Sequence, residues 1–245
     1  MVINMEAFKK ILKNRHTLVF MDFEGTQFSH EIIAIGLCKT HCDDSGMIDG
    51  DYQTYKRYVK SYGPIGKIVN RMTNITPEIL KEEGVTFETA LQEIREFVGD
   101  DINDTAFIAF GSNDVKMIID SLKYSKPTND HIGLDICKHS IDFLAFLSQF
   151  IKDDKGNNYS LVNYLKLYNK EPFGQSHDPL NDAIDLMNLY KEFMDNKEIR
   201  SREYINVIKK QKIYPTPIKR IINKLLNNEC VTPEDFKKEI DKYIE

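Results

Sequence analysis

The sequence predicts an α/β fold with a mixed sheet, because its apolar pattern changes between strand-like and helix-like periods along the chain. Two apolar, β-prone runs, TLVFMDFEGT at 17–26 and EIIAIGLCKT at 31–40, indicate adjacent core strands. Helical stripes follow from residue 86 onward, and a further apolar run at 105–110 lies among them. With 245 residues, 41% of them hydrophobic, the chain can bury one main core and carry an extension.

The first half of the chain contains four further element signals. Residues 1–15 carry apolar side chains at helical spacing, so we expect a short amphipathic helix that packs on the main domain. DYQTYKRYVK at 51–60 alternates in polarity and predicts a third, more exposed strand. TPEIL at 76–80 opens with a capping residue and a proline, as helices do, and FETALQEIREFV at 87–98 predicts a core helix.

The second half is expected to be mostly helical. TAFIAFGSND at 105–114 predicts a fourth strand and a tight turn into a helix, and HIGLDIC at 131–137 is the candidate for a short fifth strand. From residue 138 onward we expect helices, including SLVNYLKLY at 160–168 and PLNDAIDLMNLYKEFM at 179–194.

The composition changes after residue 195. Residues 197–224 hold nine Lys or Arg and only two Glu, whereas the end of the chain is acidic and helix-like. The sequence therefore predicts three parts: an N-terminal helix at 1–15, a main domain at 16–195, and a helical, partly basic extension at 196–245.

Composition also restricts location and partners. No apolar run approaches the roughly 20 residues that cross a bilayer, and charges interrupt the first residues, unlike a secretory segment. The four cysteines lack paired spacing, as is typical of reduced thiols, so we expect a cytoplasmic protein without a membrane partner. The net charge of −5 argues against a surface that coats DNA, but not against an enzyme that binds a few nucleotides.

A pair of carboxylates ends the first predicted strand. Residues two apart in a strand point to the same face, so Asp22 and Glu24 in FMDFEGT project side by side. Adjacent anions favour a bound cation, and Mg²⁺ or Mn²⁺ is the natural partner because hard divalent ions prefer carboxylate oxygens. Acids at strand ends are also common without a ligand, so further residues are needed to support a metal site.

Three more residues extend this set. Asp114 follows an apolar strand and a tight turn, where α/β sheets carry functional residues; a helix-start acid favoured by the dipole is the alternative. In HDPLNDA, Asp178 can cap the helix and Pro179 suits its first position, whereas Asp182 lies about one turn in, where capping does not explain it. His177 is five positions before Asp182, so its imidazole could reach a water near the same metals.

Together, the DxE on a first strand, the Asp after a later strand and the His-x4-Asp near the end resemble the DnaQ-like exonucleases, the DEDDh branch of the ribonuclease H-like fold. The resemblance covers roughly residues 16–195 and includes RMTNITPEIL at 71–80 and SLVNYLKLY at 160–168. It implies a ribonuclease H-like mixed five-stranded sheet flanked by helices. The histidine at this spacing distinguishes the branch from its tyrosine-bearing relative.

The family's chemistry supplies roles for these residues. Its four carboxylates hold two metal ions and its histidine is the general base. The resemblance therefore implies two Mg²⁺ or Mn²⁺ ions with His177 as the base and with these metal ligands: Asp22, Glu24, Asp114 and Asp182. Two metals about 3.5 to 4 Å apart stabilise the attacking and leaving oxygens of a phosphodiester, so nucleoside 5′-monophosphates would be released.

Substrate contacts are expected just after the DxE. Gly25, Thr26 and Phe28 fall where family members hold the terminal nucleotide through backbone contacts and an apolar wedge, although a loop Phe is as often a packing residue. The family often has a small residue where this chain has Pro179, and commonly a basic residue where it has Ser176.

The sequence leaves the sugar of the substrate, the oligomeric state and the partner of the basic segment open. We expect a 3′-5′ exonuclease that acts on single-stranded RNA or short oligonucleotides, with RNA favoured over DNA. One alternative is a proofreading-like DNA exonuclease, for which residues 196–245 could supply a polymerase-binding segment. A second alternative is a catalytically silent nucleic-acid-binding module, but such a loss should replace an acidic ligand, and all five positions are intact.

Overall fold

The computed structural model describes residues 5–13, 15–99, 102–210 and 214–244, which form two compact units. The first unit contains the described residues up to Leu147 together with Tyr159–Lys197. The second contains Ser148–Asn158 together with the described residues from Glu198 onward. The predicted division at residue 196 stays a prediction.

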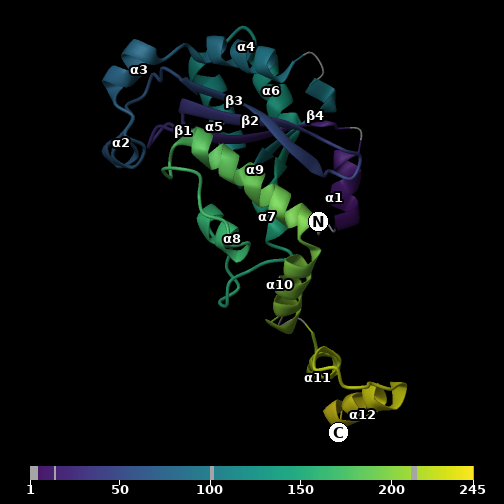
Figure 1. Cartoon of the computed structure of the whole chain (residues 1–245). Coiled ribbons are helices and arrows are strands. Elements are labelled where there is room, and N and C mark those ends of the chain that lie inside the picture. Colours follow the sequence, from purple (N-terminus) through teal and green to yellow (C-terminus); the bar gives the residue numbers. More distant parts are fainter. Residues whose placement is uncertain (1–4, 14, 100–101, 211–213, 245) are drawn as a thin grey trace. The chain divides into compact units, whose positions relative to one another are not determined.

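The described residues of the first unit form a five-stranded sheet in the order β3-β2-β1-β4-β5 (Figure 1). β1 pairs antiparallel with β2 and parallel with β4, while β2 and β3 are antiparallel and β4 and β5 parallel, so the predicted mixed sheet is confirmed. The strands are β1 (Thr17–Gly25), β2 (Ile32–Cys42), β3 (Ile48–Tyr58), β4 (Thr105–Ala109) and β5 (Ser140–Asp142).

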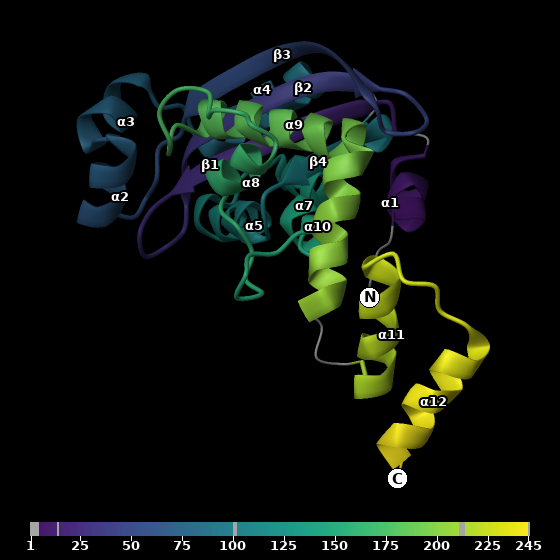
Figure 2. The same ribbon diagram turned by 60° about the horizontal axis from the view of Figure 1, so that its bottom comes forward.

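Helices cover both faces of the sheet. α9 crosses one face over β1 and β2, and α4 lies on the other (Figure 1). Figure 2 shows α2 and α3 side by side near the end of the sheet where β1 finishes. The helices of this unit are α1 (Met5–Leu12), α2 (Lys67–Thr73), α3 (Pro77–Glu83), α4 (Phe87–Val98), the 3-10 turn η1 (Ile102–Asp104), α5 (Asn113–Ser125), α6 (Asp130–Lys138), α7 (Phe143–Leu147), α8 (Leu161–Leu167) and α9 (Pro179–Asp195).

Alternation along β1 divides the core between the two faces. Met21 and Phe23 pack beneath α4, whereas Phe20 points to the α9 face and meets Tyr190 with 5.3 Å between ring centroids. On that face Phe8 of α1 stacks on Phe146 at 4.0 Å. The predicted N-terminal helix is therefore part of the core of the first unit.

The expected fifth strand at 131–137 is wrong, because these residues lie in α6. Its apolar residues alternate as in a strand, but Ile132 and Ile136 are buried while Leu134 is 49% exposed. Burial at positions four apart is the period of a helix that packs one face on its neighbours. The fifth strand is the short β5, which lies where the sequence predicted helix and which pairs with β4.

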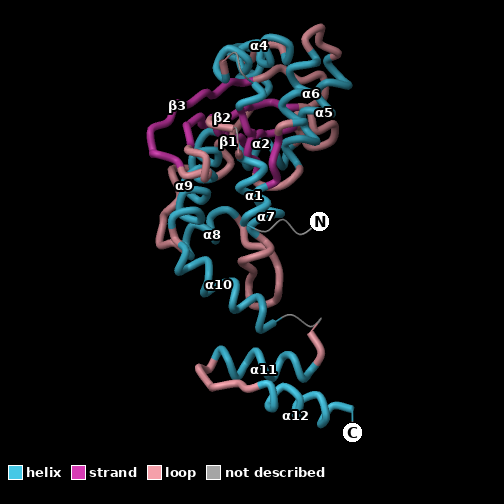
Figure 3. The backbone as a smooth tube through the Cα atoms, turned by 90° about the vertical axis from the view of Figure 1, so that its right-hand side faces the viewer, coloured by secondary structure: helices cyan, strands magenta, loops and turns pink. Residues whose placement is uncertain are grey.

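The second unit is helical, as predicted for the extension. Its helices are α10 (Lys197–Lys210), α11 (Thr216–Leu226) and α12 (Pro233–Ile244), and Figure 3 shows α11 and α12 packed as a hairpin. The buried Glu239 of α12 accepts hydrogen bonds from Arg220 and Lys224 of α11 at 3.2 and 3.4 Å. None of the described helices combines the length with the apolar character that a membrane-spanning helix needs.

Gly36 of β2 sets the position of α9. A Cβ atom at Gly36 would lie 2.1 Å from the carbonyl carbon and oxygen of Pro179 and 2.3 Å from the backbone nitrogen of Leu180. These are backbone atoms of the first turn of α9, which cannot yield as a flexible side chain can. The helix therefore reaches this closeness only because position 36 has no side chain.

We predict that Gly36→Ala destabilises the fold by about 1–3 kcal/mol, because a methyl group there must push the first turn of α9 off the sheet. Urea denaturation measures the loss. Gly133→Ala is the matched control, since its Cβ would meet only side-chain carbons of Ile118 and Leu122, at 3.3 Å. Equal losses at the two positions would contradict this account of the contact.

Candidate functional site

Asp22 and Glu24 lie on the α9 face of β1, near the end of the strand. Phe23 between them points into the core under α4, so alternation directs both carboxylates to the opposite face. Both are partly buried, with the Glu24 side chain 16% exposed. Their partners on β2 are the small residues Gly36 and Ala34, which let the start of α9 approach this face.

Asp114 enters the same region from the first turn of α5. The chain turns from β4 into α5 at Gly111, whose φ of 109° favours glycine. The Asp114 side chain is buried, and its Oδ1 accepts a hydrogen bond from the backbone N–H of Phe23 at 3.0 Å. Asp114 is therefore directed at β1, between the two carboxylates of that strand.

The start of α9 supplies the fourth acidic residue. Asp178 caps this helix by accepting hydrogen bonds from the N–H groups of Leu180 and Asn181 at 3.1 and 3.4 Å, and Pro179 occupies its first position. Lys56 of β3 pairs with Asp178 at 2.5 Å. This first turn, pressed against Gly36, brings Asp182 to the carboxylates of β1.

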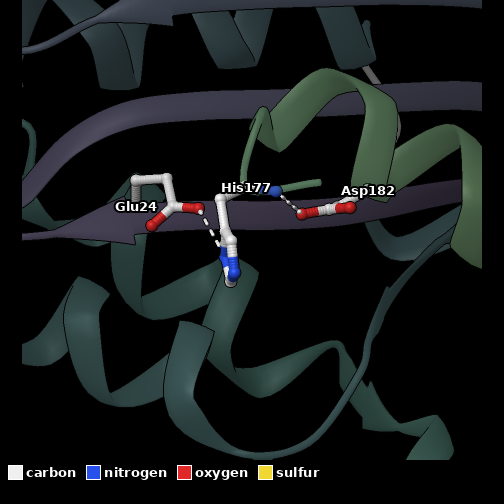
Figure 4. Close-up of side chains that lie close together, drawn as sticks. All are labelled: Glu24, His177 and Asp182. Atoms are coloured by element: carbon white, nitrogen blue, oxygen red, sulfur yellow. Dashed lines mark hydrogen bonds and ion pairs between the residues drawn. The ribbon is translucent and has the colours of Figure 1, made fainter. Parts of the chain in front are cut away.

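His177 lies just before α9, with its backbone in the left-handed region at φ 63°. Its N–H donates to Asp182 Oδ2 at 2.9 Å, and its imidazole Nδ1 lies 3.9 Å from Glu24 Oε1, as Figure 4 shows. The side chain is 49% exposed. Left-handed backbone at a residue other than glycine is uncommon and concentrates at functional positions.

The five predicted catalytic residues line one cavity of about 400 Å³. They come from β1, α5, the loop before α9, and α9 itself. Three of the described residues form a possible metal-binding group, because one ligand atom from each lies within 4.8 Å of the other two. They are Glu24, His177 and Asp182. Asp22 and Asp114 line the same cavity without belonging to this set.

Burial and mutual repulsion raise the pKa values of these carboxyl groups. Burial raises the pKa of Glu24 to about 8, with a further contribution from the charge of Asp182. Burial, followed by the charge of Asp114, raises the pKa of Asp22 well above its usual range. Burial is also the main cause of the raised pKa of Asp182. The pKa of Asp114 is raised by burial too, against the hydrogen bond from Phe23.

This donor set suits a hard divalent cation. Carboxyl groups that keep protons near neutral pH, because they are crowded and desolvated, give up those protons when a cation balances their charge. Carboxylate oxygens are the ligands that Mg²⁺ and Mn²⁺ prefer. No Lys or Arg of the described chain forms an ion pair with Asp22, Glu24, Asp114 or Asp182.

The three predicted substrate-binding residues do not line this cavity. Thr26 is 1% exposed, and its hydroxyl bonds to the Ser29 hydroxyl at 2.7 Å and accepts from the Glu31 N–H at 3.0 Å. Gly25 ends β1 at an irregularity in the pairing, and Phe28 is 70% exposed. Their role in substrate binding stays a prediction.

Apart from Ser176, which was named only as a departure from the family pattern, the sequence did not identify the other residues of the site. Lys56 was expected only as part of an exposed strand, and no sequence signal pairs it with Asp178 across 122 positions. Ser160 caps α8 and could have been found as a helix start, but not as part of a cavity wall. The remaining lining residues are Phe23, Phe110, Asn113, Met117, Leu161, Val162 and Ser176.

No protein-family model matches the chain, and no curated protein matches it. Several solved structures do. The cell-death related nuclease 4 (CRN-4) is 15% identical with a TM-score of 0.60, covering 76% of this chain and 66% of that one. The nuclease domain of 3′hExo, a DEDDh family member bound to rAMP, is 16% identical with a TM-score of 0.60, covering 75% and 94%. The E. coli ExoI–ssDNA complex is 14% identical with a TM-score of 0.55, covering 80% and 43%.

The chain therefore has the fold of these nucleases, and the ribonuclease H-like fold implied by the resemblance is confirmed. It spans only 66% of CRN-4 and 62% of a full-length 3′-exonuclease that also matches. At identities of 12–16%, this similarity defines the fold.

We predict that the metal-free fold is less stable at pH 8 than at pH 6. The folded chain holds a proton on Glu24 up to about pH 8, whereas the unfolded chain releases it near the usual value of 4.5. Raising the pH between these values therefore lowers the free energy of unfolding. Mg²⁺ or Mn²⁺ should reverse the loss, raising the free energy of unfolding by about 2.7 kcal/mol when the metal concentration is 100 times the dissociation constant. Thermal melts at both pH values, with chelator and with metal, measure the effect.

Asp114→Asn is the matched variant for this experiment. It keeps an acceptor for the Phe23 N–H but removes one charge from the cavity. We expect it to melt at a higher temperature than the parent in chelator at pH 8, and to gain less from metal. A lower melting temperature with an unchanged metal response would make Asp114 a structural helix-start acid.

Proposed function

We propose that the protein is a metal-dependent 3′-5′ exonuclease that releases nucleoside 5′-monophosphates from single-stranded ends. The observation that carries this proposal is the one cavity in which four elements bring these residues together: Asp22, Glu24, Asp114, His177 and Asp182. Crowded carboxyl groups destabilise a fold when no cation balances them, so a cluster of this kind indicates chemistry.

The four carboxylates would hold two Mg²⁺ or Mn²⁺ ions. When bound, such ions stabilise charge on phosphodiester oxygens and activate a water nucleophile near neutral pH. Asp22 and Glu24 present their oxygens from a rigid strand, and Asp114 is fixed against that strand by the Phe23 N–H. Asp182 faces them from the first turn of α9, so helix and strand together orient the reacting phosphate.

His177 would act as the general base. Its Nδ1 is turned toward Glu24, which leaves Nε2 to take the proton from the attacking water. The hydrogen bond from the His177 N–H to Asp182 holds the left-handed turn and with it the position of the ring. Half exposure of the side chain lets the proton pass on to solvent.

The 3′-terminal nucleotide would lie against the loop after β1. Gly25 and Thr26 lie at the start of this loop, where the Thr26 N–H donates to the Glu31 carbonyl oxygen at 2.8 Å and so holds the loop in place. Phe28, 70% exposed and four positions beyond Glu24, offers a ring that can wedge against the terminal base. The cavity of about 400 Å³ would take the terminal phosphodiester, so the nucleotide at the end of the strand would be the one removed.

We favour RNA as the substrate over DNA. The support is the nuclease domain of 3′hExo, whose structure holds rAMP and has a TM-score of 0.60 to this chain, against 0.55 for ExoI, whose structure holds ssDNA. A proofreading-like DNA exonuclease is the alternative, with the second unit as its polymerase-binding part. A catalytically silent binding module is disfavoured, because the catalytic positions are all present and lie together.

We predict that the protein converts end-labelled single-stranded RNA into a ladder with one-nucleotide steps, only with Mg²⁺ or Mn²⁺. Matched RNA and DNA strands, single and double, establish the preferred sugar. Asp182→Asn should lower the rate by orders of magnitude, because one metal ligand loses its charge. Cleavage of closed circles, or equal rates for parent and Asp182→Asn, would contradict the proposal.

We further predict that the basic stretch of the second unit contributes affinity for the strand beyond the cavity. Charge reversal at Lys209 and Lys210 should weaken RNA binding and flatten its salt dependence, by about 0.7 in the log–log slope per lost phosphate contact. Lys212, the third residue of this hypothesis, lies outside the described residues. Charge reversal at the exposed Lys237 and Lys238 of α12 is the control. A salt slope equal to the parent's would dismiss the hypothesis.

A further inference from the structure

A second hollow of about 330 Å³ lies where the chain leaves β3, apart from the carboxylate cavity. Lys60, Ser61 and Tyr62 line one side of it, and Ser125 at the end of α5 lines another. Tyr62 is 75% exposed, the highest value among the exposed large hydrophobic side chains of the described residues. Glu88, which also lines the hollow, accepts hydrogen bonds at its Oε1 from the N–H and the hydroxyl of Thr128, so this oxygen is turned toward Thr128.

The backbone that presents Tyr62 is fixed. The buried Glu31 accepts hydrogen bonds from the N–H groups of Tyr62 and Gly63 at 2.7 and 2.9 Å, and from the Ser29 hydroxyl at 2.6 Å. A Cβ at Gly63 would lie 2.6 Å from Ser29 Oγ, so the two loops are closely packed. An exposed ring on a fixed backbone loses little entropy when a ligand stacks on it.

The hollow is near the end of the sheet that carries the active site. Glu24, Ala34 and Tyr58 form one row across β1, β2 and β3, which places Tyr58 about 10 Å from Glu24. The hollow begins two residues beyond Tyr58. From the cavity, α5 runs from Asp114 to Ser125, about 16 Å at 1.5 Å per residue. A few nucleotides of an extended strand span this distance.

We infer that this hollow is a second nucleotide subsite, in which Tyr62 stacks on a base upstream of the 3′ end and Lys60 faces a phosphate. The inference rests on the proposed function, since it places the strand that enters the cavity. Exposed aromatic rings next to basic side chains are how proteins hold single strands without reading sequence. The ligand class is therefore single-stranded nucleic acid longer than the segment that the cavity holds.

Binding and turnover separate this subsite from the active site. Fluorescence anisotropy with a ten-nucleotide single-stranded RNA, in chelator so that hydrolysis stops, gives the affinity. Tyr62→Ala should weaken binding at least about fivefold, the equivalent of one stacked base, whereas Tyr62→Phe should keep the parent's affinity. Lys60→Ala should weaken binding and flatten its salt dependence. Hydrolysis of a dinucleotide should be unchanged in all three variants, because a dinucleotide does not reach the hollow.

Tyr52→Ala is the matched control, since Tyr52 lies within β3, is 43% exposed and pairs with Thr40 toward the other end of the sheet. Equal affinities of parent, Tyr62→Ala and Lys60→Ala, with unchanged melting temperatures, would overturn the subsite even if dinucleotides are cleaved. Tight RNA binding that depends on Tyr62, without hydrolysis in metal, would support the subsite and sink the proposed exonuclease. Should Tyr62→Ala fold poorly, Lys60→Ala decides the question, because an affinity and salt dependence equal to the parent's in that variant would overturn the subsite.

Discussion

The site depends on the contact between the backbone of α9 and the backbone of β2 at Gly36. Side chains normally separate a helix from the sheet it covers, but here the backbone of Pro179 occupies the place that a Cβ atom at position 36 would take. Gly36 is the β2 partner of Asp22, so the place of closest approach is also the place of the carboxylates. Asp182 and His177 reach β1 because this one position lacks a side chain.

This close approach has an electrostatic cost, because it brings like charges together in a desolvated cavity. The raised pKa values of Asp22, Glu24 and Asp182 express that cost, with burial as the main cause. Asp178, which caps α9, forms an ion pair with Lys56, so a positive charge balances this carboxylate. The charge of Asp178 is therefore balanced within the protein, whereas the carboxylates that line the cavity are left for a cation to balance.

Large aromatic packing on the α9 face keeps the helix in place against that repulsion. Phe20 of β1, Phe143 of α7 and Tyr190 of α9 meet with ring centroids 5.3 Å apart in two of their pairs, and Tyr190 also donates to the Gly46 carbonyl oxygen at 2.7 Å. Aromatic pairs of this kind add about 0.5–1.5 kcal/mol each beyond the area they bury. The half of α9 far from the site therefore fixes the half that carries Asp182.

The sequence by itself determined the strands before and after the site, the mixed sheet and the five residues that share the cavity, because alternation, capping and motif spacing are local properties. It failed at 131–137, where an alternating apolar pattern fits strand and helix equally, and only the neighbours of Ile132 and Ile136 select the helix. No sequence pattern indicated the ion pair of Lys56 with Asp178, or the hydrogen bond from the Tyr62 N–H to Glu31. Those pairs join residues 122 and 31 positions apart, so they exist only once β3 has paired with β2 and α9 has settled on Gly36.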